Sequence, residues 1–436
     1  MHRVALVAVG LLWASTAALA DPWIVPGDTG LRHDLALLAD RGVIRAPLST
    51  WPLSWGDISA DLQREYADAR LDSAGRAALM RVRARATQAL RRTGMTPGLR
   101  LSLAEEPRRL RDFSSTPRDP GEVQGSLAWT GLRFSYRLQV TAVSEPLDER
   151  NVRTDGSYAG VVLGNWMFSA GNMDRWWGPG WNGGLIMSSN ARPVPVLAMR
   201  RNYSDPFKTP LLGWMGPWTM SVLYGQLEGN REIPNARLFG VRLNFRPLSS
   251  LEIGLSRTAQ WCGSSRPCGL GTFGELLLGI DNRGENTNID EEPGNQLGGI
   301  DWRWTLPFFN GSTAFYGEAI GEDEASNLPS RYIGQLGVET AGYIDRWDAS
   351  WRVHVEIADT AAEFYSDPTR FDYAYEHFIY SDGYRYHGRA TGHTMDADGR
   401  MLAIGSYLRD RKGNEWQFRV RHFELNRREE VSLPHT

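Results

Sequence analysis

The sequence predicts an all-β, antiparallel transmembrane barrel that follows a small N-terminal helical bundle. Two observations carry this prediction. Apolar residues recur at helical spacing up to about residue 97 and then at every second position almost to the end of the chain. After residue 20 the chain lacks an uninterrupted apolar run of the ~20 residues that a membrane-spanning helix needs. Any crossing of a bilayer is therefore expected from strands.

Residues 1–20 have the composition of a secretory signal peptide. A short basic start is followed by an apolar run over 4–13 and by the small residues Ala18 and Ala20. The apolar run is shorter than a spanning helix requires. We therefore predict cleavage after Ala20 and export of the mature chain.

Residues 21–97 form the predicted helical bundle. Leucines recur at helical spacing after Asp28, a candidate N-cap, and a second apolar stripe follows Ser54. A third helix is predicted over 72–92, where arginines face away from the apolar stripe. Two interpretations of this basic face stay open, namely contact with anionic lipid or polysaccharide and simple solvation.

The predicted barrel occupies residues 98–436. Residues 132–140 and 347–357 alternate between apolar and polar side chains, and shorter runs at 239–245 and 416–420 repeat the pattern. The 347–357 run has about the length of one transmembrane strand. Segments of this kind number roughly sixteen to eighteen and are separated by turn-forming clusters. The expected topology is an antiparallel meander.

The number of strands decides which face of the barrel meets lipid. A barrel of this width has a lumen too wide for ordinary side chains to fill, so the apolar face is expected to point outward. Arg133, Arg137, Arg352 and Glu356 would then line a hydrated interior. Aromatic residues near strand ends suit interfacial girdles; they are Trp218, Trp302, Trp304, Tyr343 and Trp347. A large soluble sandwich or propeller is the alternative fold.

Composition and cysteine spacing narrow the partners further. The 48 basic residues are balanced by 51 acidic ones, so charge gives no reason to expect nucleic acid as a partner. The two cysteines, Cys262 and Cys268, lie close together around Gly263 and Pro267. In an exported chain this spacing predicts a loop-closing disulfide rather than a metal pair.

One segment departs from the alternating pattern. It extends from Gly171 to Leu185 and contains the run Trp-Trp-Gly-Pro-Gly-Trp-Asn at 176–182. Together with segments 25–28, 35–42, 251–261 and 385–388, this run is similar to the Wzi capsule assembly family. The resemblance extends over nearly the whole mature chain.

The resemblance implies an outer-membrane barrel of about eighteen strands, with the helices of 21–97 on the periplasmic side. It also implies a lectin-like protein that attaches or organises capsular or exopolysaccharide at the surface of a Gram-negative cell. The expected partners are this polysaccharide and outer-membrane lipid, and the expected state is a monomer.

The 171–185 segment itself has two interpretations. As a polysaccharide site, its indoles would stack on sugar rings while its polar side chains bond hydroxyls or uronic acid carboxylates. The residues predicted for this site are Asp174, Arg175, Trp176, Trp177, Trp181 and Asn182. As a structural element, Gly178, Pro179 and Gly180 would set a tight bend that packs the tryptophans into the barrel wall or lumen.

Two other functions stay open. A porin-like channel or exporter is favoured by the charged lumen-facing set, and an outer-membrane hydrolase would need a Ser–His pair that the sequence does not single out. The sequence has no nucleophile elbow, zinc-protease helix or phosphate loop. The carboxylate-rich loop 281–292 lacks the spacing of a calcium loop. We therefore predict no catalytic residues, no metal and no cofactor.

The end of the chain is unusual for such a barrel. A predicted strand near 414–426 is followed by Leu433-Pro434-His435-Thr436 instead of a terminal strand that ends in an aromatic residue. An unpaired strand edge in lipid is costly. The sequence therefore predicts that the strand near 99–106 either pairs with the last strand or leaves a seam.

Overall fold

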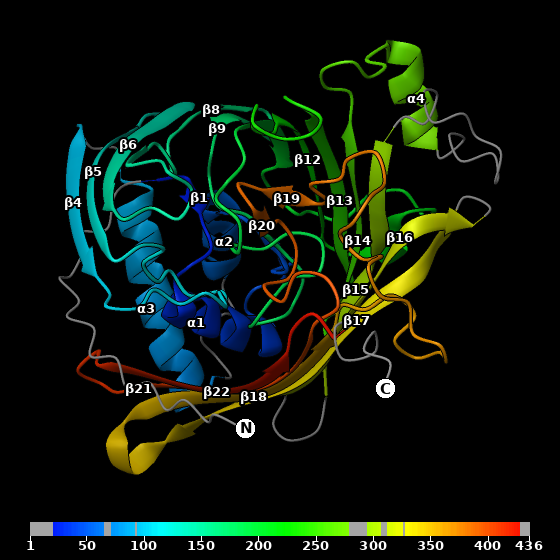
Figure 1. The fold of residues 1–436 in the computed structure, drawn as a ribbon. Helices are drawn as coiled ribbons and strands as arrows, with labels where there is room; N and C mark the ends of the chain where they lie inside the picture. Colours follow the sequence, from blue (N-terminus) through cyan, green and yellow to red (C-terminus); the bar gives the residue numbers. More distant parts are fainter. Residues whose placement is uncertain are drawn as a thin grey trace.

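The computed structural model describes residues 21–64, 71–91, 94–278, 294–306, 312–325 and 328–427. The predicted signal peptide, the carboxylate-rich loop 281–292 and residues 428–436 lie outside the described residues. Figure 1 shows a ring of strands that encloses helices and loops. None of the helices in the described ranges is long and apolar enough to cross a membrane.

The main sheet contains sixteen strands in the described residues, and every pairing in it is antiparallel. Fifteen strands follow one another in chain order around the ring, and β7 pairs with β6 beside them. The strands are β4 (Thr96–Leu103), β5 (Gly121–Thr130), β6 (Phe134–Ser144), β7 (Val152–Arg153), β8 (Tyr158–Leu163), β9 (Trp166–Gly171), β11 (Val196–Arg201), β12 (Trp218–Gln226), β13 (Arg237–Leu248), β14 (Leu251–Trp261), β15 (Gly294–Thr305), β16 (Thr313–Ala325), β17 (Leu328–Ile344), β18 (Ala349–Asp359), β21 (Arg400–Arg409) and β22 (Glu415–Glu424).

Helices and short strands make up the remaining elements. The helices are α1 (Thr29–Asp40), α2 (Trp55–Leu62), α3 (Ser73–Ala89) and α4 (Leu270–Leu278), with short 3-10 turns η1 (Gly213–Met215) and η3 (Asp345–Trp347). Three further two-stranded sheets pair β1 (Trp23–Ile24) with β3 (Leu53–Ser54), β2 (Thr50–Trp51) with β10 (Trp176–Trp177), and β19 (Arg385–Tyr386) with β20 (Arg389–Ala390).

The apolar face of the alternating strands points outward, as predicted. Leu99, Leu101 and Leu103 of β4 are largely exposed, and so are Leu336 of β17 and Ile357 of β18. Large exposed apolar side chains recur on most of the other strands. Exposed leucines in this number are stable only against hydrocarbon, so the ring has the surface of a membrane barrel.

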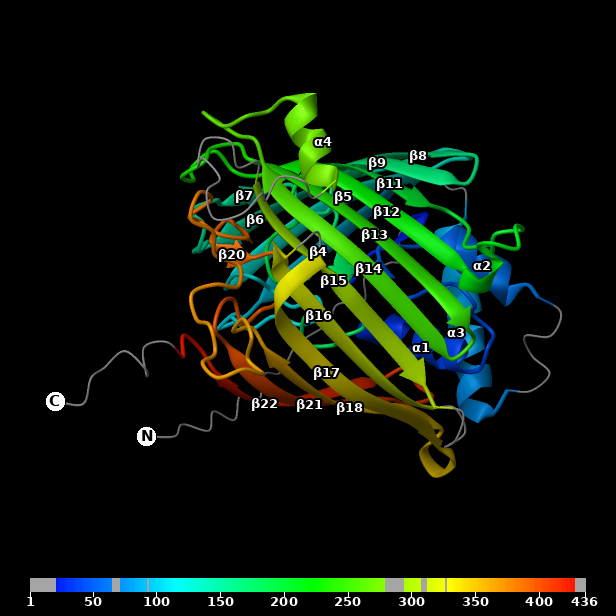
Figure 2. The same cartoon turned by 90° about the vertical axis from the view of Figure 1, so that its right-hand side faces the viewer.

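The two ends of the barrel differ in their connections. Figure 2 shows α2 and α3 at one end and β20 at the other; we call these the helix end and the loop end. Connections at the loop end include the long segments 104–120, 172–195 and 360–399. At the helix end, β5 and β6 are joined by three residues and β13 and β14 by two. Outer-membrane barrels have short periplasmic turns and longer extracellular loops.

The predicted girdle residues gather near the helix end of the barrel. Trp218 begins β12, Trp302 and Trp304 lie near the end of β15, and Tyr343 and Trp347 flank the turn between β17 and β18. Trp304 and Trp347 are exposed. The exposed Trp304 and Trp347 suit a membrane interface. The girdle prediction is wrong for Tyr343, which packs against the buried core of the helices inside the barrel.

The seam predicted from the C-terminal sequence lies between β4 and β22. In the described part of the chain β4 pairs with β5 alone and β22 with β21 alone. β4 and β22 are the first and last of fifteen successive antiparallel strands. The chain reverses direction fourteen times between them, so the two edge strands run in the same direction. Contacts from inside the barrel hold β22 instead: Asp112 forms ion pairs with Arg419 at 3.0 Å and with Arg421 at 2.5 Å.

A plug fills the barrel, and it is built from α1 and segments 172–195 and 360–399 (Figure 1). Helix α1 is buried along nearly its whole length because it lies against inward-facing wall residues. Asp40 at its end bonds Arg303 of β15 at 2.6 Å, and His33 Nδ1 lies 3.2 Å from Arg352 Nε of β18. The predicted hydrated interior is therefore wrong at Arg352 and Glu356, which are fully buried against the plug.

The other two residues expected in the lumen also have different surroundings. Arg137 of β6 forms an ion pair with Asp21 at 2.8 Å, so it holds the N-terminal segment around Asp21. Arg133 is exposed in the short turn between β5 and β6. The inward-facing charges thus serve as attachments for the N-terminal segment, because buried cations need paired anions.

Three arginines of the basic face of α3 make contacts within the protein, whereas Arg76 and Arg91 are exposed to solvent. Arg81 forms an ion pair with Asp34 of α1 at 2.5 Å, and Arg85 pairs with Asp28, the residue that caps α1. Arg83 donates to the backbone oxygen of Leu62 at 2.9 Å. These arginines hold α3 against the other two helices.

A buried carboxylate in α2 gives a pH-dependent prediction. Asp57 accepts two hydrogen bonds of 3.1 Å from the backbone N–H and hydroxyl of Ser204. Burial raises the pKa of Asp57 to about 6 from 3.8. The folded state therefore binds a proton more tightly than the unfolded state, so stability falls as pH rises from about 4 to about 6, by about 2 kcal/mol.

The variant Asp57→Asn is expected to remove this dependence, because its amide oxygen still accepts from Ser204 but carries no charge. Urea unfolding of the detergent-solubilised chain should show the variant more stable than the unaltered chain at pH 7 and equal to it at pH 4. A stability difference that is the same at both pH values would contradict this reading.

Candidate polysaccharide site

The 171–185 segment is fastened to the barrel wall by its backbone. Glu356 of β18 accepts hydrogen bonds from the backbone N–H of Trp181 at 2.8 Å and of Asn182 at 3.0 Å. Glu318 of β16 accepts from Leu185 N–H at 2.8 Å. A loop inside a barrel has N–H groups that strands do not satisfy, and the oxygens of a carboxyl group can accept hydrogen bonds from them. The wall glutamates therefore position this segment.

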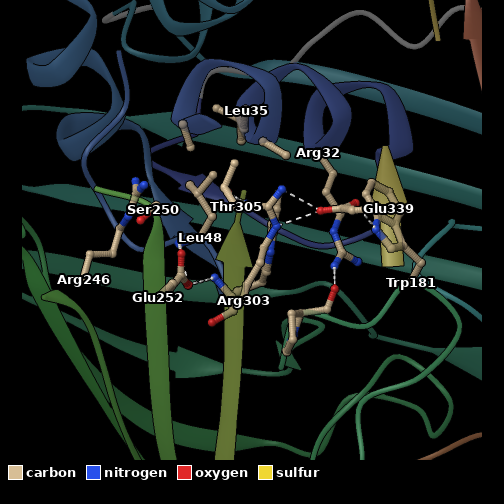
Figure 3. Close-up of a pocket in the computed structure, with 15 residues that line it drawn as sticks. Arg32, Leu35, Leu48, Trp181, Arg246, Ser250, Glu252, Arg303, Thr305 and Glu339 are labelled. Atoms are coloured by element: carbon tan, nitrogen blue, oxygen red, sulfur yellow. Dashed lines mark hydrogen bonds and ion pairs between the residues drawn. The ribbon is translucent and has the colours of Figure 1, made fainter. Parts of the chain in front are cut away.

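Glu339 of β17 makes a further attachment. Its carboxylate accepts from Trp181 Nε1 and from Arg303 Nε, each at 2.7 Å, and it forms an ion pair with Arg352, whose Nη1 lies 2.7 Å away. Figure 3 shows Glu339 and Arg303 below α1, with Trp181 beside them. One buried carboxylate thus joins three wall strands, β15, β17 and β18, to the plug.

Arg32 of α1 completes this cluster. Its guanidinium carbon lies 4.1 Å from the Trp181 ring and 4.3 Å from the Phe113 ring, and it donates to the backbone oxygen of Pro179 at 2.6 Å. Burial lowers the pKa of Arg32 to about 10. A small cavity of about 40 Å³ remains beside it (Figure 3). It lies between α1 and the wall and is large enough for about one water molecule.

The predicted site residues differ in their exposure to solvent. Trp176, Trp177, Trp181 and Asn182 are at most 5 % exposed, and Trp176 and Trp177 form β10, which pairs with β2. Arg175 is also buried and donates to the Met173 backbone oxygen at 2.9 Å. The structural interpretation of the motif accounts for these five residues. The side chain of Asp174 is 38 % exposed.

Asp174 lines a second, polar cavity of about 120 Å³ at the loop end. The cavity lies between the inner faces of β4, β5 and β6 and the segments 111–118 and 153–155. Its wall side presents Arg100, Glu122, Gln124, Gln139 and Thr141, and its plug side presents Arg111, Arg118, Asp174 and Ser189. Amides, hydroxyls and guanidinium groups are the donors and acceptors that bind sugar hydroxyls and carboxylates.

The sequence reasoning did not single out Arg111, Arg118 or Ser189. The signal available was the density of arginines between the first two strands, where Arg108, Arg109 and Arg111 lie in one short run. This arginine density did not identify a site in the sequence, because only the fold brings the arginine run close to Ser189. Arg111 Nε donates to the Ser189 backbone oxygen at 3.2 Å across 78 positions of sequence.

The disulfide pair lies on the other side of the barrel mouth. Cys262 and Cys268 are bonded, with Cα atoms 4.7 Å apart, directly after β14. The chain then enters α4, whose Phe273 packs edge-on against Phe239 with ring centroids 5.3 Å apart. Figure 1 shows α4 outside the ring of strands.

An outward apolar belt, a ring of antiparallel strands and a plugged lumen define an outer-membrane β-barrel with a closed interior. The chain belongs to the Wzi capsule assembly family, because the family model described as "Capsule assembly protein Wzi" matches residues 89–435.

Two relatives support this assignment. An uncharacterised 55.8 kDa protein in the cps region of Klebsiella pneumoniae is 32% identical over 454 residues, which cover 100% of this chain and 85% of that protein. The solved structure of Escherichia coli Wzi has a TM-score of 0.78 and 30% identity, and the match covers 93% of this chain and 86% of that one. That structure is described as an outer-membrane protein involved in group 1 capsule assembly and a carbohydrate-binding β-barrel.

Proposed function

We propose that this protein binds capsular polysaccharide at the outer surface of the outer membrane and holds it on the cell without making or breaking bonds. The observation that carries the proposal is the polar cavity at the loop end, which lies beside Asp174 in a barrel of the Wzi family. The helix end would face the periplasm. The apolar belt would contact outer-membrane lipid, and one chain would suffice, since wall, plug and cavity come from a single chain.

For the predicted six-residue site, the proposal separates two roles. Asp174 would contact the polymer directly, because it lines the cavity. The other five residues are buried, so they would act indirectly, by fixing the loop that carries Asp174. They are the three tryptophans, Arg175 and Asn182. Sugar stacking on these indoles would require the plug to open.

The proposal is tested by deleting the gene in an encapsulated strain and measuring cell-bound and free polymer. The expected result is unchanged total polymer with most of it released into the medium, and recovery of the cell-bound fraction when the full chain is supplied. Complementation with Arg411→Ala serves as the matched control, because Arg411 is 83 % exposed at a turn of the helix end. An unchanged cell-bound fraction in the deletion strain would refute the role.

The filled lumen gives a separate prediction about conductance. Helix α1 and the 171–185 segment occupy the barrel interior and are bonded to several wall strands. We therefore expect no open aqueous path for ions through the part of the barrel that the structure describes. In planar bilayers the purified protein is expected to give no stepwise current at moderate voltage. Stable single-channel steps would show that the protein acts as a porin.

A further inference from the structure

We propose that the polar cavity at the loop end binds the carboxylate of an acidic sugar, a uronic acid or a pyruvylated residue, within the polymer. This inference rests on the proposed function and adds the chemical class of the sugar. The ligand groups are the guanidinium groups of Arg111 and Arg118 and the hydroxyl of Ser189.

Three arginines converge on two consecutive backbone carbonyls. Arg111 Nε and Arg118 Nη2 donate to the same Ser189 oxygen at 3.2 Å and 3.0 Å. Arg118 Nη1 and Arg389 Nε both donate to the Asn190 oxygen, at 2.9 Å and 3.1 Å. Neutral backbone carbonyl oxygens hold these guanidinium groups together, although their like charges repel one another. An anion placed among them would relieve that repulsion.

The arginine cluster is poorly neutralised in comparison with its neighbours. In the part of the chain that the structure describes, Arg111 and Arg389 form no ion pair, and Arg118 has Asp174 at 3.6 Å. Burial, then the nearby charge of Arg118, lowers the pKa of Arg111 to about 9.

Nearby arginines are neutralised by carboxylates of their own. Arg153 is paired with Asp119 and Asp148, and Arg192 with Asp148 and Asp155. The cavity lining holds four arginines, Arg100, Arg111, Arg118 and Arg153, against three carboxylates, Glu122, Asp155 and Asp174. Glu122 accepts from the backbone N–H of Arg118 and Asp174 lies 3.6 Å from its guanidinium, so positive charge remains in excess at the Arg111 and Arg118 side.

Ser189 supplies a second, independent observation. Its hydroxyl is buried, with the residue 8 % exposed, and has no hydrogen-bond partner among the described residues. A buried hydroxyl without a hydrogen-bond partner is destabilising, so such groups are rare unless a ligand or a water molecule bonds them. Ser189 lines the cavity next to Arg111. Its hydroxyl can donate to a carboxylate oxygen held by the arginines.

The dimensions and the opposite wall favour a sugar over a free inorganic anion. A volume of about 120 Å³ corresponds to about four water molecules, which is enough for a carboxylate and the adjoining edge of a ring. Gln124 and Thr141 lie on the wall side, where they can bond ring hydroxyls. A phosphate group would use the arginines equally well but would leave this wall without partners.

The test is calorimetric titration of the detergent-purified full chain with three probes: a glucuronate-containing capsular polysaccharide, the same polymer after chemical reduction of its carboxyl groups, and neutral dextran. We expect the reduced polymer to bind about tenfold more weakly than the acidic one, the size expected for loss of a charge-assisted hydrogen bond. Dextran is expected to show no binding.

Two variants locate the effect in the cavity. Ser189→Ala removes a hydroxyl that has no internal partner, and Arg118→Lys keeps the charge but loses the planar fork. Each is expected to weaken binding of the acidic polymer about threefold to tenfold and to leave binding of the reduced polymer unchanged. Arg411→Ala is the control for a substitution outside the cavity, at the helix end. An unchanged tryptophan emission spectrum shows that the variants are folded.

The outcomes separate the two proposals. If the unaltered chain binds neither capsular polymer, the proposed function fails. If it binds both equally, or if the two variants behave like Arg411→Ala, the carboxylate site is wrong while the function stands. Competition by inorganic phosphate as strong as that by free glucuronate would overturn the assignment of the anion to a sugar.

Discussion

Replacement of Glu339 by alanine is expected to destabilise the folded protein by about 3–5 kcal/mol, because it leaves buried cations without their anion. Arg352 is 1 % exposed at its side chain and has Glu339 at 2.7 Å. Arg303 keeps Asp40 at 2.6 Å, so part of the cluster survives. The substitution also removes the acceptor of the Trp181 indole N–H. The plug is therefore expected to loosen before the barrel unfolds.

The measurement is the urea midpoint of tryptophan emission together with protease cleavage of the 171–185 segment. Glu339→Gln keeps an acceptor for Trp181 but not the charge, so it separates the indole bond from the ion pairs. Arg411→Ala removes an exposed pair with Asp348 at 3.5 Å and is expected to cost at most about 0.5 kcal/mol. A Glu339→Ala midpoint equal to that of Arg411→Ala would show that the cluster does not stabilise the plug.

Gly178→Ala is the second substitution with a large expected effect, about 2–5 kcal/mol. Gly178 has φ +117, where an L side chain is strained, and an added Cβ would overlap the Glu318 carboxylate. Strain costs about 1–3 kcal/mol and overpacking a similar amount. Glu318 would have to move and would then lose its bond to Leu185 N–H. The bend of the motif would no longer fit against β16.

Gly164→Ala is the matched control for this experiment. Gly164 has φ +58 in the turn between β8 and β9, with nothing within 4 Å of an added Cβ. This variant carries the conformational strain without the overlap, about 1–2 kcal/mol. Near-ultraviolet circular dichroism should show altered tryptophan packing in Gly178→Ala alone. Identical spectra and midpoints for the two variants would mean that the contact with Glu318 is unimportant.

The barrel was predictable because its signal is local. Alternation over 347–357 corresponds to β18 at Ala349–Asp359, and the run at 132–140 corresponds to β6 at Phe134–Ser144. Side chains in a strand point to opposite faces, so period 2 identifies both the strand and its apolar side. The helices were predictable for the same reason, since Asp28 caps α1 and Ser54 caps α2.

The plug was not predictable, because its contacts join distant parts of the sequence. Arg352 contacts His33 across 319 positions, and Arg421 contacts Asp112 across 309. Periodicity places Arg352 on the inner face but cannot say whether water or a helix lies opposite. The expectation of a hydrated interior followed from barrel width alone. It is wrong because the N-terminal helix occupies the lumen.

The candidate site was predicted only in part. Asp174 lies at the polar cavity, but the tryptophans that made the motif conspicuous are buried as β10 and beneath Arg32. Indoles suit sugar stacking and core packing equally, so residue type could not separate the two. Arg111, Arg118 and Ser189 come from two loops whose meeting depends on the plug.

The fastening of the plug to the barrel wall has a consequence for avidity. A loop-end surface that is already ordered loses little conformational entropy when a sugar lands on it. A capsular polymer repeats the same unit many times, and many barrels share one cell surface. Weak attachment at each barrel then suffices, because every engaged unit raises the effective concentration of the next. Any single sugar unit could then dissociate from its barrel while the polymer as a whole stays attached to the cell.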